Sequence, residues 1–266
     1  MVKASQVCSS THSAASGSPV GGLVELVVQR PHMVGVLGRQ PITRGHRVAP
    51  WWNGPMLTSA GDQELLVRQA ALQAEAAQVL AELDLGRLFG DVGPVLVVGS
   101  YLSGLMCWRD LDVCLLAGVD YSPSDVLELL KRVVELPGVV GFSYRDERGE
   151  QCPTGEARDE RYHVPFDLDA GQGRWRIDLS VFLRDLHGHV ADWHLRLRDT
   201  LTDQQRLAVL RIKDMWHRLP SYPDEVGGWE IYTAVLGDGV RTPEQFARWL
   251  AANGFPGPSE AAMRTE

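Results

Sequence analysis

Two aspartates one residue apart, Asp110 and Asp112, are the residues of this chain best placed to do chemistry. They lie at the start of an apolar run, residues 111–116, that predicts a strand, and side chains two apart in a strand point to the same face. Two carboxylates on one face repel each other unless a cation lies between them. Mg²⁺ takes oxygen ligands and commonly shares them with substrate phosphates. The pair therefore predicts a metal-dependent centre for phosphoryl or nucleotidyl transfer; the alternative is two solvent-facing acids with Arg109 as their ion-pair partner.

A glycine and a serine precede this pair at a spacing that suits phosphate binding. Residues 95–98 form a short apolar run typical of a strand, and Gly99 and Ser100 follow it directly. Glycine allows a phosphate to approach the backbone closely, and serine offers a hydroxyl and an N–H to a triphosphate oxygen. Without the downstream aspartates, the same two residues would indicate an ordinary turn from a strand to a helix.

Three short motifs follow one another in the order of a known signature: Gly99-Ser100, Ser103-Gly104 and Asp110-Leu111-Asp112. This order resembles the DNA polymerase beta-like nucleotidyltransferase superfamily, over about residues 63–183. The resemblance implies a third carboxylate on a later strand, for which Asp178 is the candidate. It implies that the three acids hold Mg²⁺, with two ions roughly 3.5–4 Å apart that bridge the attacking and leaving oxygens. Asp178 would complete the second metal position and orient the attacking hydroxyl, or take its proton.

A second pair with the same spacing, Asp167 and Asp169, is an alternative source of acids. It lies beside a glycine-rich turn and no Gly-Ser motif precedes it, so we interpret both residues as acids at the edge of a loop. If Asp178 pointed away from Asp110, Asp167 would replace it.

Downstream residues offer weaker candidates. Lys213 could contact a triphosphate, but Arg211 and Lys213 flank different faces of a predicted helix, and a solvated face is the alternative. Three histidines and two aspartates could suggest zinc, although we favour a polar connection: Asp185, His187, His189, Asp192 and His194. Four aromatic residues are expected in a helical core, where one could stack on a base: Trp216, Trp229, Tyr232 and Trp249.

Composition narrows the function. The chain has 266 residues and a net charge of −8, which disfavours tRNA or DNA as the main substrate because proteins that grip a polyphosphate backbone usually carry a basic surface. The four cysteines form no metal or disulfide framework, which suggests a reducing cytoplasm. No apolar run approaches the roughly 20 residues that cross a bilayer. A cytoplasmic enzyme with a small or cationic acceptor is therefore expected.

Three regions are predicted along the chain. Residues 1–58 form a flexible or irregular extension, residues 59–190 the nucleotidyltransferase core, and residues 191–266 a C-terminal helical region. Periodicity predicts helices over 62–85 and 123–136, strands over 95–98, 111–116, 139–144, 162–168 and 175–183, and a charged loop over 145–161. Helices over about 202–218, 229–236 and 242–253 follow. The expected fold class is α/β (α+β), a small mixed β-sheet with helices on one side.

The leading functional hypothesis is transfer of a nucleoside monophosphate from ATP, or another nucleoside triphosphate, to a hydroxyl acceptor. Pyrophosphate leaves, and the protein contributes positioning and charge neutralisation. Small-molecule adenylyltransferases that modify aminoglycoside-type antibiotics are similar in layout, by analogy of fold. The alternatives are a protein or RNA acceptor in a toxin–antitoxin setting, and a nucleotide-binding module that does not catalyse. The sequence leaves the oligomeric state open.

Overall fold

Helix α1 (Ala60–Leu83) opens the part of the chain that this computed structural model describes, namely residues 59–152, 157–184, 188–223 and 225–255. A capping box fixes its start: the Asp62 N–H donates to Ser59 Oγ at 3.2 Å, and the Ser59 N–H donates to Asp62 Oδ2 at 2.9 Å. Asp84, with φ +42°, separates it from α2 (Leu85–Phe89). The extension predicted over residues 1–58 lies outside the described residues.

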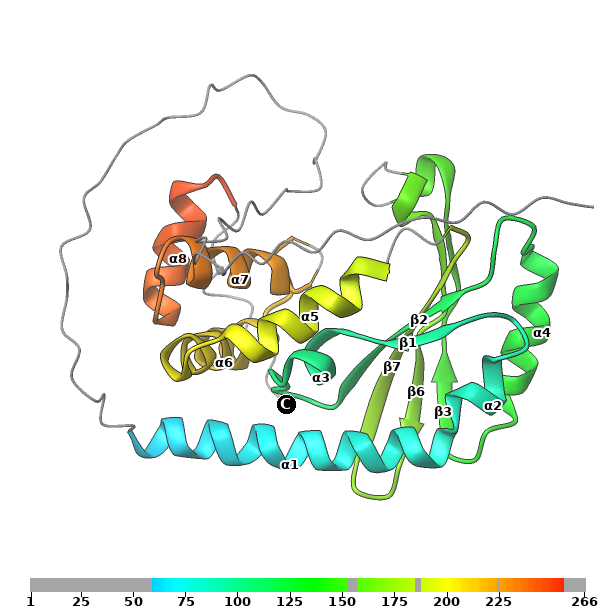
Figure 1. Cartoon of the computed structure of the whole chain (residues 1–266), viewed down its shortest axis with the longest axis horizontal. Helices are drawn as coiled ribbons and strands as arrows, with labels where there is room; N and C mark the ends of the chain where they lie inside the picture. The colour runs from blue at the N-terminus through cyan, green and yellow to red at the C-terminus, as the bar shows by residue number, and fades with distance from the viewer. Residues whose placement is uncertain (1–58, 153–156, 185–187, 224, 256–266) are drawn as a thin grey trace, which may run out of the picture. The chain divides into compact units, whose positions relative to one another are not determined.

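Seven described strands form one mixed sheet with the order β1-β2-β7-β5-β4, in which β6 pairs with β7 and β3 (Figure 1). The strands are β1 (Val95–Val97), β2 (Asp110–Leu116), β3 (Val139–Phe142), β4 (Arg145–Glu147), β5 (Arg161–His163), β6 (Phe166–Asp169) and β7 (Arg174–Phe182). Only the β2–β7 pair is parallel among these ladders. The predicted fold class, a mixed sheet combined with helices, is confirmed.

Two sequence predictions about the sheet were wrong. The charged loop expected over 145–161 contains β4 and the 3₁₀ turns Gly149–Gln151 and Ala157–Asp159. The single strand expected over 162–168 is divided into β5 and β6 at Pro165, which has no N–H to donate to the ladder. Both parts keep one register on β7, because His163 pairs with Ser180 and Phe166 pairs with Ile177.

The two faces of β2 and β7 differ sharply. On one face, the side chains at alternate positions are at most 1% exposed: Leu111, Val113, Leu115, Ile177, Leu179 and Val181. They share one core with α1, α2 and α4 (Pro123–Val134). The other face carries the polar residues of the candidate site, and its far end packs against Val190 and Ala191 of α5 (Gly188–Thr200). Helices therefore contact both faces, which corrects the expectation of helices on one side.

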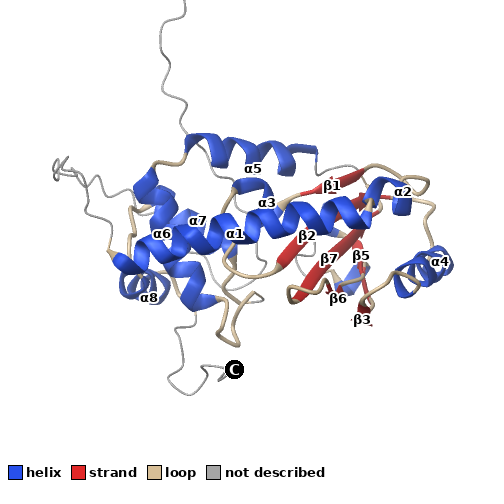
Figure 2. Cartoon of the chain, turned by 90° about the horizontal axis from the view of Figure 1, so that it is seen from below, coloured by secondary structure: helices blue, strands red, loops and turns tan. Residues whose placement is uncertain are grey.

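A second core joins α5 with α6 (Asp203–Trp216), α7 (Gly228–Gly237) and α8 (Pro243–Ala252). Helix α1 runs along both cores (Figure 2): Leu66 packs on the helical core and Leu72 on the core of the sheet. The predicted boundary between residues 190 and 191 stays a prediction. No helix in the described ranges combines the length and apolar character needed to span a membrane.

Candidate functional site

Parallel pairing of β2 with β7 gathers three aspartates on one face of the sheet. In this ladder Asp112 lies opposite Asp178, and Asp110 lies opposite Arg176. Since side chains two apart in a strand share a face, Asp110, Asp112 and Asp178 all point to the same side. Arg109, the partner in the alternative interpretation, pairs instead with Glu75 at 2.8 Å.

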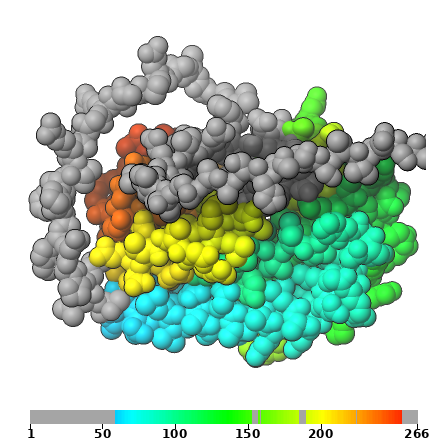
Figure 3. Space-filling model, viewed as in Figure 1, coloured from blue at the N-terminus to red at the C-terminus, as the bar shows by residue number. Residues whose placement is uncertain are grey.

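The three aspartates line a cavity of about 710 Å³ between the sheet and the helical region. Its sheet wall also includes six neighbouring residues: Gly99, Ser100, Cys114, Arg161, Ser180 and Phe182. The helical wall includes basic and aromatic side chains: Trp193, His194, Arg196, Lys213, Tyr222, Trp229 and Tyr232. Binding sites for small molecules typically measure about 300–1,000 Å³, so a nucleotide fits this volume. Figure 3 shows α5 beside the segment that contains α1 and α3 on one face of the molecule.

Gly99 begins the short helix α3 (Gly99–Ser103) and is constrained by Asp112. Its φ is +64°, and a Cβ added here would lie 1.7 Å from Asp112 Oδ2. The Ser100 backbone N–H donates to the Asp112 carboxylate, and the Val98 N–H donates to the Asp112 carbonyl at 2.9 Å. The glycine therefore makes room for Asp112, and its predicted role in the close approach of a phosphate stays a prediction.

The carboxyl groups influence one another strongly. Burial, followed by the charges of Asp112 and Asp178, raises the pKa of Asp110 well above its ordinary value. Burial and Asp178 also raise the pKa of Asp112. Burial pushes the pKa of Asp178 upward too, but the hydrogen bond from His163, together with the charges of His163, Arg161 and Arg176, outweighs burial and lowers the pKa overall. Three acids on one face of the sheet favour a bound cation, which would offset their repulsion.

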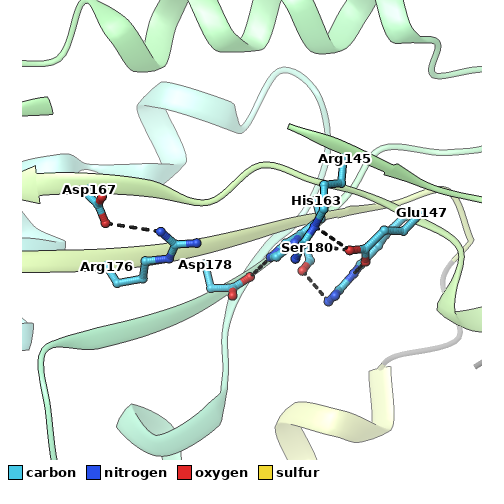
Figure 4. Close-up of polar contacts among 8 residues, drawn as sticks. Arg145, Glu147, His163, Asp167, Arg176, Asp178 and Ser180 are labelled. Atoms are coloured by element: carbon cyan, nitrogen blue, oxygen red, sulfur yellow. Dashed lines mark hydrogen bonds and ion pairs between the residues drawn. The ribbon is translucent and has the colours of Figure 1, made fainter. Parts of the chain in front are cut away.

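A hydrogen-bond network on neighbouring strands surrounds Asp178 (Figure 4). His163 on β5 is 4% exposed, and its Nε2 lies 2.6 Å from Asp178 Oδ1. Arg161 donates to Ser180 Oγ at 2.9 Å and to Glu147 Oε2 at 2.7 Å. None of these four residues was predicted from the sequence as part of the site. Ser180 could have been found, since it lies two positions after Asp178, but the others required the strand pairing.

Lys213 on α6 is buried, so the solvated helix face considered for it is wrong. The residue is 3% exposed, its Nζ donates to the Leu105 carbonyl at 3.2 Å, and the Nζ lies 4.9 Å from the centre of the Trp108 ring. Burial would lower the pKa of Lys213, but the electrostatic effects of Tyr232, Tyr222, Cys107 and Asp112 together outweigh burial and raise the pKa overall. Arg211, in contrast, pairs with Asp62 at 2.6 Å, away from the cavity.

The helical wall is also aromatic. The ring of Trp193 lies 5.9 Å from that of Trp229 and 5.4 Å from that of Tyr232, measured between centres. Trp216 and Tyr232 are buried as expected, although Tyr232 also lines the cavity. Burial and Lys213 lower the pKa of His194 to about 4, and its Nδ1 is a buried atom with no hydrogen-bond partner among the described residues.

The second Asp-x-Asp pair does not line this cavity. Asp167 lies 3.4 Å from Arg176, and Asp169 accepts a hydrogen bond from the Gly171 N–H at 3.1 Å. Both aspartates belong to β6, but Asp167 lies inside the strand and Asp169 is its last residue, so only Asp169 fits the interpretation as an acid at the edge of a loop. Of the possible zinc ligands, Asp185, His187 and the side chain of His189 lie outside the described residues.

The three carboxylates are the oxygen ligands that this cavity offers to a metal ion. Within the described ranges, no three His, Cys, Asp or Glu side chains are grouped as a metal site. Here Asp112 accepts from the backbone of Ser100, and Asp178 bonds to His163. The chemistry of the three carboxylates nevertheless fits a hard cation, because Mg²⁺ prefers oxygen ligands and is commonly held by one or two carboxylates together with substrate phosphates.

Comparisons with known proteins give structural similarity at low sequence identity. No known family and no curated protein matches the chain. The non-canonical poly(A) polymerase complex GLD-2–GLD-3 aligns with 12% identity and a TM-score of 0.44, over 70% of this chain and 61% of that one. The GLD-2/RNP-8 complex aligns with 13% identity and a TM-score of 0.43, over 68% of this chain and 67% of that one. The Cid1 poly(U) polymerase with Mg and 3′-dATP bound aligns with 16% identity and a TM-score of 0.37, over 57% of this chain and 46% of that one. The aligned region thus spans about three fifths of the length of the GLD-2–GLD-3 polymerase chain.

Proposed function

We propose that this chain is a metal-dependent nucleotidyltransferase that moves a nucleoside monophosphate from ATP, or another nucleoside triphosphate, to a hydroxyl acceptor. The observation that supports this most strongly is the convergence of Asp110, Asp112 and Asp178 on one wall of a cavity that a nucleotide fits. Structural ion pairs rarely place three carboxylates together, since their repulsion destabilises the fold unless a ligand offsets it.

Each side chain has a defined task in this proposal. Asp110, Asp112 and Asp178 would hold Mg²⁺, which supplies charge neutralisation for the triphosphate when bound. Gly99 and the Ser100 N–H keep the Asp112 carboxylate in place. Lys213, at the opposite wall, stabilises the negative charge of the phosphates.

The chemistry follows from this arrangement. The acceptor hydroxyl oxygen forms a bond to the α-phosphorus while the bond between that phosphorus and the β-phosphate oxygen breaks, so that pyrophosphate leaves. Asp178 orients the hydroxyl by accepting its hydrogen bond and takes the proton. Positioning supplies most of the acceleration, as is usual for phosphoryl transfer.

The charges next to the aspartates favour a small or cationic acceptor over a polyanion. On the sheet beside Asp178, the arginines pair with acids: Arg145 and Arg161 with Glu147, at 3.0 and 2.7 Å, and Arg176 with Asp167, at 3.4 Å. Arginines that grip a phosphate backbone need their donors free for it. This mixed surface, together with the net charge of −8, supports the small acceptor.

Incubation with α-labelled ATP, Mg²⁺ and separate acceptors tests the proposal. A cationic polyhydroxylated molecule of the aminoglycoside type, an RNA oligonucleotide and a protein extract serve as the acceptors, and pyrophosphate release and label transfer are measured. We expect label on the small acceptor and none with Asp112→Asn. Label on RNA or protein would overturn the small acceptor but keep the reaction. Tight ATP binding without pyrophosphate release, unchanged in Asp112→Asn, would identify a nucleotide-binding module instead.

A further inference from the structure

A chain of hydrogen bonds crosses three strands and ends on Asp178. In the β4–β5 ladder Arg145 lies opposite His163, and in the β5–β7 ladder His163 lies opposite Ser180, two residues beyond Asp178. Arg145 Nη2 is 2.5 Å from His163 Nδ1, and His163 Nε2 is 2.6 Å from Asp178 Oδ1. Figure 4 shows the histidine between the arginine and the aspartate.

The chemistry of arginine fixes the direction of this chain. A guanidinium group has donors and no acceptor, so Arg145 must donate to Nδ1, and Nδ1 must present a lone pair. A neutral imidazole with a lone pair on Nδ1 carries its proton on Nε2. Nε2–H then donates to Asp178 Oδ1. Glu147 holds Arg145 in place, since its Oε1 is 3.0 Å from Arg145 Nε.

We propose that Arg145 and His163 are positioning residues that orient Asp178, with Arg145 selecting the Nε2–H tautomer of His163. The hydrogen bond occupies Oδ1 and leaves the second oxygen, which points away from His163 (Figure 4), to bind a cation or the acceptor. Partners that orient a ligating carboxylate tune metal sites in this way. The inference rests on the proposed function for its catalytic meaning, although the tautomer itself does not.

Removal of Arg145 has a defined consequence for the histidine. Glu147 Oε1 lies 3.5 Å from His163 Nδ1, so without the arginine a proton on Nδ1 gains an acceptor. Nε2 would then turn a lone pair toward the Asp178 carboxylate, and repulsion would displace that carboxylate. The Arg145 side chain is 59% exposed, so its replacement leaves the fold intact.

Nitrogen-15 NMR of the full chain with labelled histidine tests the tautomer, with the His163 signals assigned by their loss in His163→Gln. We expect the Nε2–H form alone in the native protein and in Arg148→Gln. The control arginine also lies beside β4, but it pairs with Asp146 at 2.6 Å and not with His163. In Arg145→Leu we expect the Nδ1–H form to appear. An unchanged spectrum in Arg145→Leu would overturn the inference.

Binding of Mn²⁺ alone, followed by electron paramagnetic resonance, tests the effect on Asp178. Loss of such a supporting partner commonly lowers metal affinity by roughly 10–100-fold, so we expect Arg145→Leu to lower the affinity for Mn²⁺ by about that factor. Arg145→Lys should restore part of this affinity, and Arg148→Gln should bind Mn²⁺ as tightly as the native protein. In a His163→Gln background, where the amide donates without a tautomer, Arg145→Leu should add less than about twofold. Equal Mn²⁺ affinity in Arg145→Leu and the native protein would overturn the positioning role.

These outcomes separate the inference from the proposed function. If the native protein releases no pyrophosphate with any acceptor while the tautomer and the Mn²⁺ affinity respond as expected, the proposed reaction fails and the positioning of Asp178 stands. If pyrophosphate is released and Arg145→Leu changes neither measurement, the reaction stands and the positioning role fails.

Discussion

The sheet wall and the helical wall of the cavity are built by different means. On the sheet, the aspartates are placed by the backbone ladder between β2 and β7, whose register puts Asp112 opposite Asp178. On the other wall, Lys213, Trp193 and Tyr232 come from three helices and are placed by packing in the helical core. The site residues of β2 and β7 lie on the face of the sheet opposite its hydrophobic core. Lys213, in contrast, lines the cavity and is itself buried in the helical region.

The two Asp-x-Asp pairs show that strand pairing, and not local spacing, decides which residues lie next to an acid. Both lie on strands that pair with β7, but β2 is parallel to β7 and β6 is antiparallel to it. The parallel register sets Asp112 beside Asp178, whereas in the antiparallel one Asp167 lies opposite Arg176. Identical local spacing therefore gives a cluster of acids in one case and an ion pair in the other.

The largest expected effect lies on the sheet wall. Replacement of Asp112 by Asn removes a metal ligand, and since bound metal stabilises the transition state by several kcal/mol, turnover should fall at least about 10³-fold. The melting temperature should stay level or rise, because one repelling charge is removed. Steady-state pyrophosphate release and thermal unfolding measure the two effects. Asp167→Asn, in the other pair, should keep native turnover; a matching loss there would place the site at β6.

Gly99→Ala is expected to have the next largest effect. The added Cβ would collide with Asp112 Oδ2, so the carboxylate must move, and the backbone at φ +64° disfavours a side chain. We expect about 1–3 kcal/mol loss of unfolding free energy and a loss of turnover on the order of 100-fold.

Gly118→Ala is the matched control for this change. Gly118 has φ +88°, and nothing lies within 4 Å of an added Cβ. It should lose a similar part of its stability, measured in urea, and keep its activity. Equal activity losses in the two variants would show that strain alone, and not Asp112, is responsible.

On the helical wall, Lys213→Met should weaken the interaction with the nucleotide and also lower the stability of the fold. The methionine keeps the apolar stem but loses the charge and the hydrogen bond to Leu105. We expect kcat/KM for ATP to fall roughly tenfold to 100-fold and the unfolding free energy to fall by about 1–3 kcal/mol, because the Leu105 carbonyl loses its partner. Lys131→Met is the exposed control. Activity loss without any loss of stability would contradict the double role of Lys213.

The smallest effect concerns the contact of α1 with the helical region. Arg211 lowers the pKa of Asp62 through their hydrogen bond, so this pair stabilises the fold above the unfolded pKa of about 3.9, and the contribution is lost as pH falls below it. Asp62→Asn should cost roughly 1–3 kcal/mol of unfolding free energy near pH 7 and progressively less below pH 4. Urea unfolding across this range, with turnover at pH 7 unchanged, checks it. A cost independent of pH would point to the cap of α1 instead of the ion pair.

Much of the fold could be predicted from the sequence because it depends on local signals. The capping boxes that begin α4 and α6 are sequence motifs, and both occur at the predicted starts of these helices. Helix α1 also begins with a capping box, but at Ser59, before the predicted start at residue 62. The β6–β7 hairpin follows from its glycine-rich turn. The division of the predicted strand at Pro165 was missed. Whether a proline interrupts a strand depends on whether its position must donate a hydrogen bond to the partner strand, and the sequence does not show the partner.

The order of residues along the chain determined which acids were available and that Asp110 and Asp112 share a face, because alternation is a property of any strand. Only the tertiary structure decided that Asp178 joins them, that Arg145 reaches it through His163, and that Lys213 is buried opposite. These placements depend on strand register and helix packing, and both bring together residues far apart in sequence, whose identities carry no record of their distance.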